Sequence, residues 1–183
     1  KRQQAVEQLE TLTQAIFHDM FGDPLSNLRG WSTAAISELG TVSTGKTPSG
    51  QKEGMYGTEV PFVTPGDLES MEPVARWLSK EGASQVRVVP AGSALVCCIG
   101  ATIGKVGVAH RRSAFNQQIN AVDWDREKVV PNYGFQVLRL FSPEIARFGA
   151  STTLPILKKS SFEKLELPCP PLEVQEKYST LVE

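Results

Sequence analysis

The sequence predicts an α+β domain: a twisted, mixed β-sheet flanked by one helix at each end of the chain. The length of 183 residues suits one domain with a core of its own. A 40% hydrophobic content with 15 Gly and 12 Pro is typical of a globular chain with many turns. Between Trp31 and Pro168, short strand-like segments dominate and helical segments come too late for repeated βαβ units.

The first element predicted is an amphipathic helix over about residues 3–21. Its apolar residues recur every three or four positions: Val6, Leu9, Leu12, Ile16, Phe17 and Met20. Gly22-Asp23-Pro24 ends it. Its start lacks a capping residue and the pattern is already running, so we expect a helix that continues upstream of this chain.

The middle of the chain predicts short strands separated by Gly, Pro and Ser. They are Val60–Val63, Gln85–Val89, Ala94–Ile99, Lys105–Ala109 and Gln118–Val122. Helical spacing follows at Asn132–Phe141 and Glu144–Phe148, whereas Lys158–Leu167 fits either structure.

A last helix is predicted to open at Pro170-Pro171, because proline is tolerated in a first helical turn. Its pattern runs to the last residue. Both terminal helices could pack on the domain's own core or form part of an antiparallel coiled coil that continues beyond the chain, and the spacing suits both. The expected organisation is a helix over 1–23, a domain over 24–169 and a following helix over 170–183.

Several classes of protein are disfavoured by composition. No apolar run approaches the roughly 20 residues of a membrane helix, and the polar start Lys1-Arg2-Gln3-Gln4 is unlike a signal peptide, so we expect a cytoplasmic protein without a membrane partner. Cys97, Cys98 and Cys169 do not form a disulfide framework and are expected to be structural. With only 2 His, no metal site is expected.

Positive charge is concentrated in two stretches, although the formal net charge is -1. Residues 82–122 contain four basic residues and no acid, and residues 145–162 contain three basic residues and no acid. Such stretches could form one positive face for a polyanion or be scattered, solvated surface, and charge alone leaves both open.

Gly40–Thr47 matches the nucleotide-binding P-loop pattern of Gly, four residues and Gly-Lys-Thr. That loop works by opening a helix whose N–H groups hold phosphates, but Pro48 disfavours a helix at Thr47. We therefore reject an ATP or GTP site here, while a Gly/Ser/Thr loop ending in lysine can still grip nucleic-acid phosphates. Catalytic constellations are also missing, so the chain is interpreted as a binder and not an enzyme.

Five segments in order resemble the specificity subunits of type I restriction-modification systems. They are Ile16–Pro24, Gly30–Ser49, Val60–Leu68, the pair Ala101–Gly107 with Phe115–Ile119, and Leu165–Gln175. The resemblance implies a non-catalytic DNA reader, with one target recognition domain where the complete subunit has two. It also implies methyltransferase and motor-nuclease partner subunits, which would carry S-adenosylmethionine and ATP, and two long helices that fix the separation of half-sites. This chain would then be a fragment, or half of a homodimer formed through its terminal helices.

Candidate DNA-binding residues follow from the roles that groove recognition needs. Positioning on phosphates is assigned to Ser43, Thr44, Lys46, Thr102, Lys105, Lys158 and Lys159. Base or groove contacts are assigned to Arg87, Arg111, Arg112, Asn116, Gln117 and Gln118. The alternative for residues 116–118 is a structural turn, while Gly100 and Gly104 are expected to permit tight turns and Trp31 to be core.

The rival interpretation is a protein-interaction or oligomerisation module that does not bind DNA. The amino-acid sequence does not predict which DNA sequence the domain would recognise, because base preference depends on loop geometry.

Overall fold

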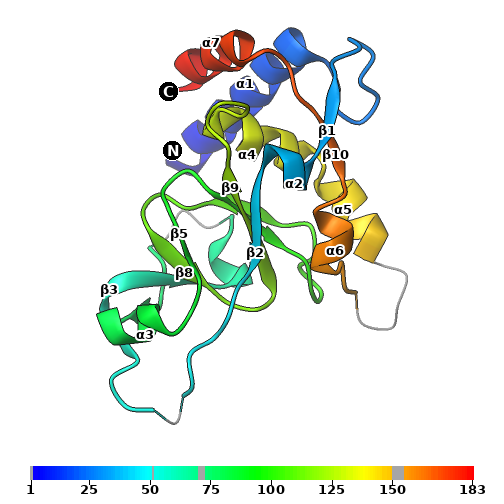
Figure 1. Cartoon of the computed structure of the whole chain (residues 1–183). Helices are drawn as coiled ribbons and strands as arrows, with labels where there is room; N and C mark the ends of the chain where they lie inside the picture. The colour runs from blue at the N-terminus through cyan, green and yellow to red at the C-terminus, as the bar shows by residue number, and fades with distance from the viewer. Residues whose placement is uncertain (1, 51, 70–72, 150–154) are drawn as a thin grey trace.

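The computed structural model describes residues 2–50, 52–69, 73–149 and 155–183 and confirms the α+β class (Figure 1). Helices are α1 (Arg2–Phe21), α2 (Ile36–Leu39), α3 (Lys80–Ser84), α4 (Pro131–Leu140), α5 (Ser142–Gly149), α6 (Lys159–Phe162) and α7 (Leu172–Val182), with a 3-10 turn at Pro65–Asp67. Strands are β1 (Thr33–Ala35), β2 (Gly40–Thr44), β3 (Tyr56–Val63), β4 (Trp77–Leu78), β5 (Val88–Val89), β6 (Ala94–Cys97), β7 (Val106–Val108), β8 (Ser113–Phe115), β9 (Ile119–Trp124) and β10 (Glu166–Pro168).

The strands form two four-stranded sheets and a two-stranded ribbon, where the sequence had predicted one mixed sheet. The central sheet has the order β2-β9-β6-β7 and is antiparallel throughout. The second sheet has the order β4-β3-β8-β5 and is mixed, because β3 pairs with β8 in parallel. β1 and β10 make the ribbon that joins the two ends of the chain.

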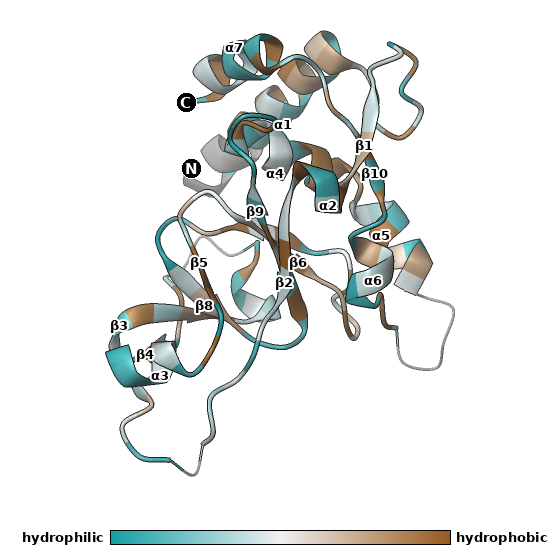
Figure 2. Cartoon of the chain, in the orientation of Figure 1, coloured by the Kyte–Doolittle hydropathy of each residue, from teal (hydrophilic) through white to brown (hydrophobic). Residues whose placement is uncertain are grey.

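The core is layered, because successive strand residues face opposite sides of a sheet. On one face of the central sheet, Val96 and Val122 pack with residues of α1, α2, α4 and α7. On the other face, Leu95 and Ile119 pack against Phe115 of the second sheet. The far face of the second sheet packs against α3. Figure 2 shows hydrophobic residues within the sheets and largely pale or teal residues along the loop between β2 and β3.

The terminal helices lie side by side and antiparallel above the central sheet (Figure 1). Phe17 of α1 stacks on Tyr133 of α4 with ring centroids 5.6 Å apart and meets Tyr178 of α7 edge-on at 5.6 Å. The C-terminal half of α1 is thus part of the domain core. Leu9 and Leu12, further back on α1, are more than half exposed. Packing on the domain core is confirmed, and the wider coiled coil stays a prediction.

The ends of the elements follow local chemistry. Gly22 adopts a positive φ of 78° as α1 ends, which glycine does without steric cost. The ambiguous segment Lys158–Leu167 divides into α6 and the first part of β10.

Within the described part of the chain, no helix is both long enough and apolar enough to cross a membrane.

Candidate nucleic-acid interface

One end of the central sheet brings together loops that are far apart in the sequence. The pairs Thr44 with Asn120, Cys97 with Ile119 and Val96 with Val106 place the ends of β2 and β6 beside the starts of β9 and β7. Residues 43–47, 98–105 and 116–118 therefore meet there. We call these residues, together with Lys158, the sheet-end surface. They include nine of the predicted DNA-binding residues: Ser43, Thr44, Lys46, Thr102, Lys105, Asn116, Gln117, Gln118 and Lys158.

The loop that leaves β2 is fixed to the turn before β9. The amide of Gly45 donates to the carbonyl of Ile119 at 3.0 Å, and that of Lys46 donates to the carbonyl of Phe115 at 3.0 Å. The hydroxyl of Thr47 donates to Oε1 of Gln117 at 2.6 Å. At the end of β2, the hydroxyl of Thr44 donates to Oδ1 of Asn120 in β9 at 2.7 Å. Ser43 of β2 is half-buried. Backbone hydrogen bonds from Gly45 and Lys46 thus hold the start of this loop in place.

Gly45→Ala tests that fixation. A Cβ at Gly45 would lie 2.0 Å from the carbonyl oxygen of Asn116, which is backbone and cannot move aside alone. We expect the free energy of unfolding, measured in urea, to fall by about 1–3 kcal/mol. Gly50→Ala is the control, since nothing lies within 4 Å of its added Cβ. Equal stability of the two variants would contradict this close approach.

The turn 116–118 is partly structural. Asn116, which is 8% exposed, accepts the amide of Gln118 at Oδ1 and donates from Nδ2 to Oε1 of Gln118. Nε2 of Gln118 donates to the carbonyl of Ile99 at 3.4 Å. The structural interpretation of the turn therefore fits Asn116 and Gln118, whose polar atoms are engaged internally. Gln117 is exposed and is the residue of the three that faces solvent.

The loop after β6 completes the surface. Gly100 and Gly104 have positive φ values of 90° and 93°, as expected for tight turns. Oγ1 of Thr102 lies 3.4 Å from Sγ of Cys97, so this hydroxyl also has an internal partner. The amide of Leu157 donates to the carbonyl of Cys98 at 2.8 Å, which brings Lys158 beside this loop.

The lysines of this surface, and Lys159 next to it in the chain, differ in their partners. Lys105 forms an ion pair with Glu69 at 3.3 Å, and Lys159 forms one with Glu163 at 3.2 Å. Lys46 and Lys158 are exposed and have no ion-pair partner among the described residues. These two lysines are therefore the ones free to meet an anion without breaking an existing pair.

Of the remaining predicted residues, Lys159 begins α6 and the three arginines flank strands of the second sheet. Arg87 immediately precedes β5, and the pairing of Val88 with Ala114 places it beside Phe115, close to the turn 116–118. Arg111 and Arg112 precede β8 at its other end. The guanidinium of Arg111 lies 5.7 Å from the centroid of the Trp77 ring. The structure thus places Arg87 near the sheet-end surface and Arg111 and Arg112 a strand's length away.

Three other kinds of site were considered in the sequence: a nucleotide-binding loop, a cysteine nucleophile and a metal centre. Residues 45–50 are not helical, so the P-loop pattern lacks the helix N-terminus it needs. Burial raises the pKa of the Cys98 thiol to about 12, opposite to the direction that activates a nucleophile. Over the residues that the structure describes, no three His, Cys, Asp or Glu side chains cluster as metal ligands.

Sequence reasoning missed Thr47 and Asn120. Asn120 is buried and anchors Thr44, and its place within an apolar strand was a signal of a hydrogen-bonded role. Thr47 belonged to the pattern that was rejected for nucleotide binding, so its neighbour Lys46 was kept and Thr47 was not.

The family model described as "Type I restriction modification DNA specificity domain" matches residues 29–181. The chain belongs to this family. It is 34% identical over 157 residues to the type I restriction enzyme HindI specificity subunit of Haemophilus influenzae, covering 80% of this chain and 33% of that protein. It is 26% identical over 163 residues to the MjaIX specificity subunit of Methanocaldococcus jannaschii, covering 84% of this chain and 37% of that protein.

Solved structures show the same fold. The HsdS subunit of Thermoanaerobacter tengcongensis matches with a TM-score of 0.66 at 22% identity over 99% of this chain and 44% of that one. The type I system S subunit of M. genitalium matches with a TM-score of 0.72 at 12% identity over 97% of this chain and 47% of that one. This specificity domain spans about a third of the length of the curated relatives and under half of the structural ones.

Proposed function

We propose that this specificity domain binds double-stranded DNA in a sequence-dependent manner and reads one half of a bipartite target. The observation that carries the proposal is the convergence at one sheet end of Lys46, Gln117 and Lys158, exposed side chains from three separate segments. Lysines suit backbone phosphates. The Gln117 carboxamide offers its Nε2 donors to a base edge, while its Oε1 already accepts the Thr47 hydroxyl. Family membership supports the same function.

The proposal includes the partners of the wider system. Methyltransferase subunits dock on the domain and its helices, a restriction subunit joins that assembly, and S-adenosylmethionine and ATP bind those subunits only. The complex works in the cytoplasm. A second recognition domain comes either from the rest of a longer subunit or from a second copy paired through α1 and α7. The exposed Leu9, Leu12 and Leu181 support pairing through the helices.

The experiment that tests DNA binding uses duplex selection. The chain, assembled with its methyltransferase subunits, is incubated with a random-sequence duplex library, and bound duplexes are sequenced and measured by anisotropy across a salt series. We expect enrichment of one half-site sequence and affinity that falls with salt. Binding that is absent at low salt would favour the rival interaction module.

The chain alone is expected to transfer no methyl group. Incubated with selected duplex and radiolabelled S-adenosylmethionine, the pure chain should leave DNA unlabelled, whereas the assembled complex should label it. The target adenine must leave the base stack to be methylated, and we assign that work to the partner. Label incorporated by the pure chain would overturn the non-enzyme assignment.

A further inference from the structure

The loop between β2 and β3 projects from the sheet-end surface (Figure 1). Its first residues are fixed to the turn before β9 by the amides of Gly45 and Lys46 and by the hydroxyl of Thr47. Beyond these contacts the loop carries exposed Ser49, Gly50, Lys52 and Glu53. A projecting polar loop held firmly at its root is a suitable carrier for contacts with a polar partner.

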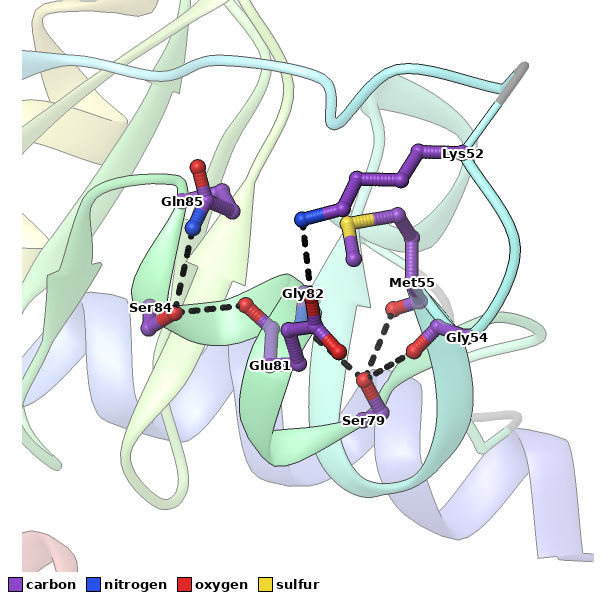
Figure 3. A network of polar contacts seen from close by, with 8 residues as sticks. All are labelled: Lys52, Gly54, Met55, Ser79, Glu81, Gly82, Ser84 and Gln85. Carbon is purple, nitrogen blue, oxygen red and sulfur yellow. Dashed lines mark hydrogen bonds and ion pairs between the residues drawn. The ribbon is translucent and has the colours of Figure 1, made fainter.

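The far end of the same loop is fixed as well, by α3 and the residue before it (Figure 3). The amide of Ser79 donates to the carbonyl of Met55 at 3.1 Å, and its hydroxyl donates to the carbonyl of Gly54. That hydroxyl also accepts the amide of Gly82 at 2.9 Å. A Cβ at Gly82 would lie 1.9 Å from the carbonyl oxygen of Met55, so the approach of loop and helix requires glycine.

Lys52 crosses from the loop to α3, as Figure 3 shows. Its Nζ lies 2.7 Å from Oε1 of Glu81, and both side chains are about half exposed, 55% and 56%. An ion pair this exposed contributes little to stability, so exchanging the carboxylate for another anion costs little. The loop thus carries two lysines: Lys46, with no described ion-pair partner, and Lys52, held by Glu81.

We propose that Lys52 is a further phosphate-contacting residue of the DNA surface, and that Glu81 holds it until DNA binds. This inference rests on the proposed function. On binding, Nζ of Lys52 leaves the Glu81 carboxylate for a backbone phosphate. The freed Glu81 carboxylate then repels the duplex and lowers the affinity for any DNA, specific or non-specific. Glu81 therefore reduces the gain in affinity that the Lys52–phosphate contact provides.

The test compares Lys52→Met, Glu81→Gln and the double variant in the chain assembled with its methyltransferase subunits. Affinity for the selected duplex is measured by anisotropy between 50 and 200 mM salt, roughly the range over which phosphate contacts are resolved. Lys52→Met is expected to reduce the slope of log affinity against log salt by about 0.9. Glu81→Gln is expected to tighten binding several-fold, by a similar factor for the selected and for non-specific duplex. In the Lys52→Met background, Glu81→Gln should have a smaller effect, because there is no lysine to release.

Lys177→Met is the matched control, since Lys177 pairs with Glu173 at 2.9 Å on the exposed side of α7, away from the sheet-end surface. Lys52→Arg should restore the salt slope, and thermal melting checks that all variants are folded. Unchanged affinity and slope in Lys52→Met and Glu81→Gln, with wild-type binding intact, would overturn this inference alone. Weaker binding in Glu81→Gln would also overturn it. Absence of wild-type binding would instead refute the proposed function.

Discussion

Replacing Lys46 and Lys158 together with alanine should weaken binding of the selected duplex roughly 30-fold at 0.15 M salt, because each lost phosphate contact removes about 0.9 from the salt slope. The slope itself should fall by about 1.8. Both lysines are exposed and have no ion-pair partner among the described residues, so their removal leaves no orphaned carboxylate behind. The measurement is a salt series by anisotropy, with thermal melting to confirm folding.

Arg111→Ala with Arg112→Ala is the comparison variant in the same experiment. These arginines lie at the opposite end of β8 from the turn 116–118, yet we expect them also to weaken binding and to make the salt slope shallower. Unchanged affinity and slope in this variant would confine the DNA surface to the sheet end. If Lys46 and Lys158 could be removed without effect, the sheet-end surface itself would be misassigned.

Gln175→Leu should be the most destabilising single change proposed. The side chain is fully buried, donates from Nε2 to the carbonyls of Lys128 and Pro170 and accepts the amide of Val130 at Oε1, at 2.8 to 2.9 Å. Leucine leaves these backbone groups without partners, and we expect a loss of about 3–5 kcal/mol in the free energy of unfolding in urea. The contacts fasten α7 to the segment before α4.

Glu176→Ala on the exposed side of the same helix is the control and should change stability by no more than about 0.5 kcal/mol. A loss below about 1 kcal/mol in Gln175→Leu would show that water replaces the amide at little cost. DNA affinity of the folded fraction should stay unchanged, because Gln175 belongs to α7, which packs on α1 and α4 and contributes no residue to the sheet-end surface.

The elements that the sequence predicted well are those with strong periodicity. The terminal helices, Ala94–Ile99 and Gln118–Val122 were confirmed to within a few residues, because one apolar face or a fully buried run is visible in a short window. β2 was missed because Gly40–Thr44 was weighed only as part of a nucleotide-binding pattern. β4 and β5 contain only two residues each, and the strand predicted over Gln85–Val89 shrank to β5.

The division into two sheets depends on pairings between distant segments. β3 pairs in parallel with β8 through Phe62 with Ala114, and nothing local in either segment specifies that partner. The candidate site shows the same limit. Residue types identified Lys46, Gln117 and Lys158. Only the register of β2, β6, β7 and β9, with the hydrogen bond from Leu157 to Cys98, shows that they share one end of a sheet. Likewise, the hydrogen bonds between Asn116 and Gln118 are local and the one from Gln118 to Ile99 is tertiary, but residue types alone do not distinguish any of them from base contacts.

The β2–β3 loop is fixed at both ends, so the residues that folding requires differ from those that a partner would contact. Its roots depend on backbone atoms of Gly45, Lys46 and Met55, with glycine required at 45 and 82. Between them Ser49, Lys52 and Glu53 are exposed and contribute little to the core. Substitutions at these positions can change the charge and hydrogen-bonding groups shown to a partner while the folding equilibrium stays nearly constant. Under the proposed function, this loop is where the charge presented to DNA can change with little effect on the stability of the domain.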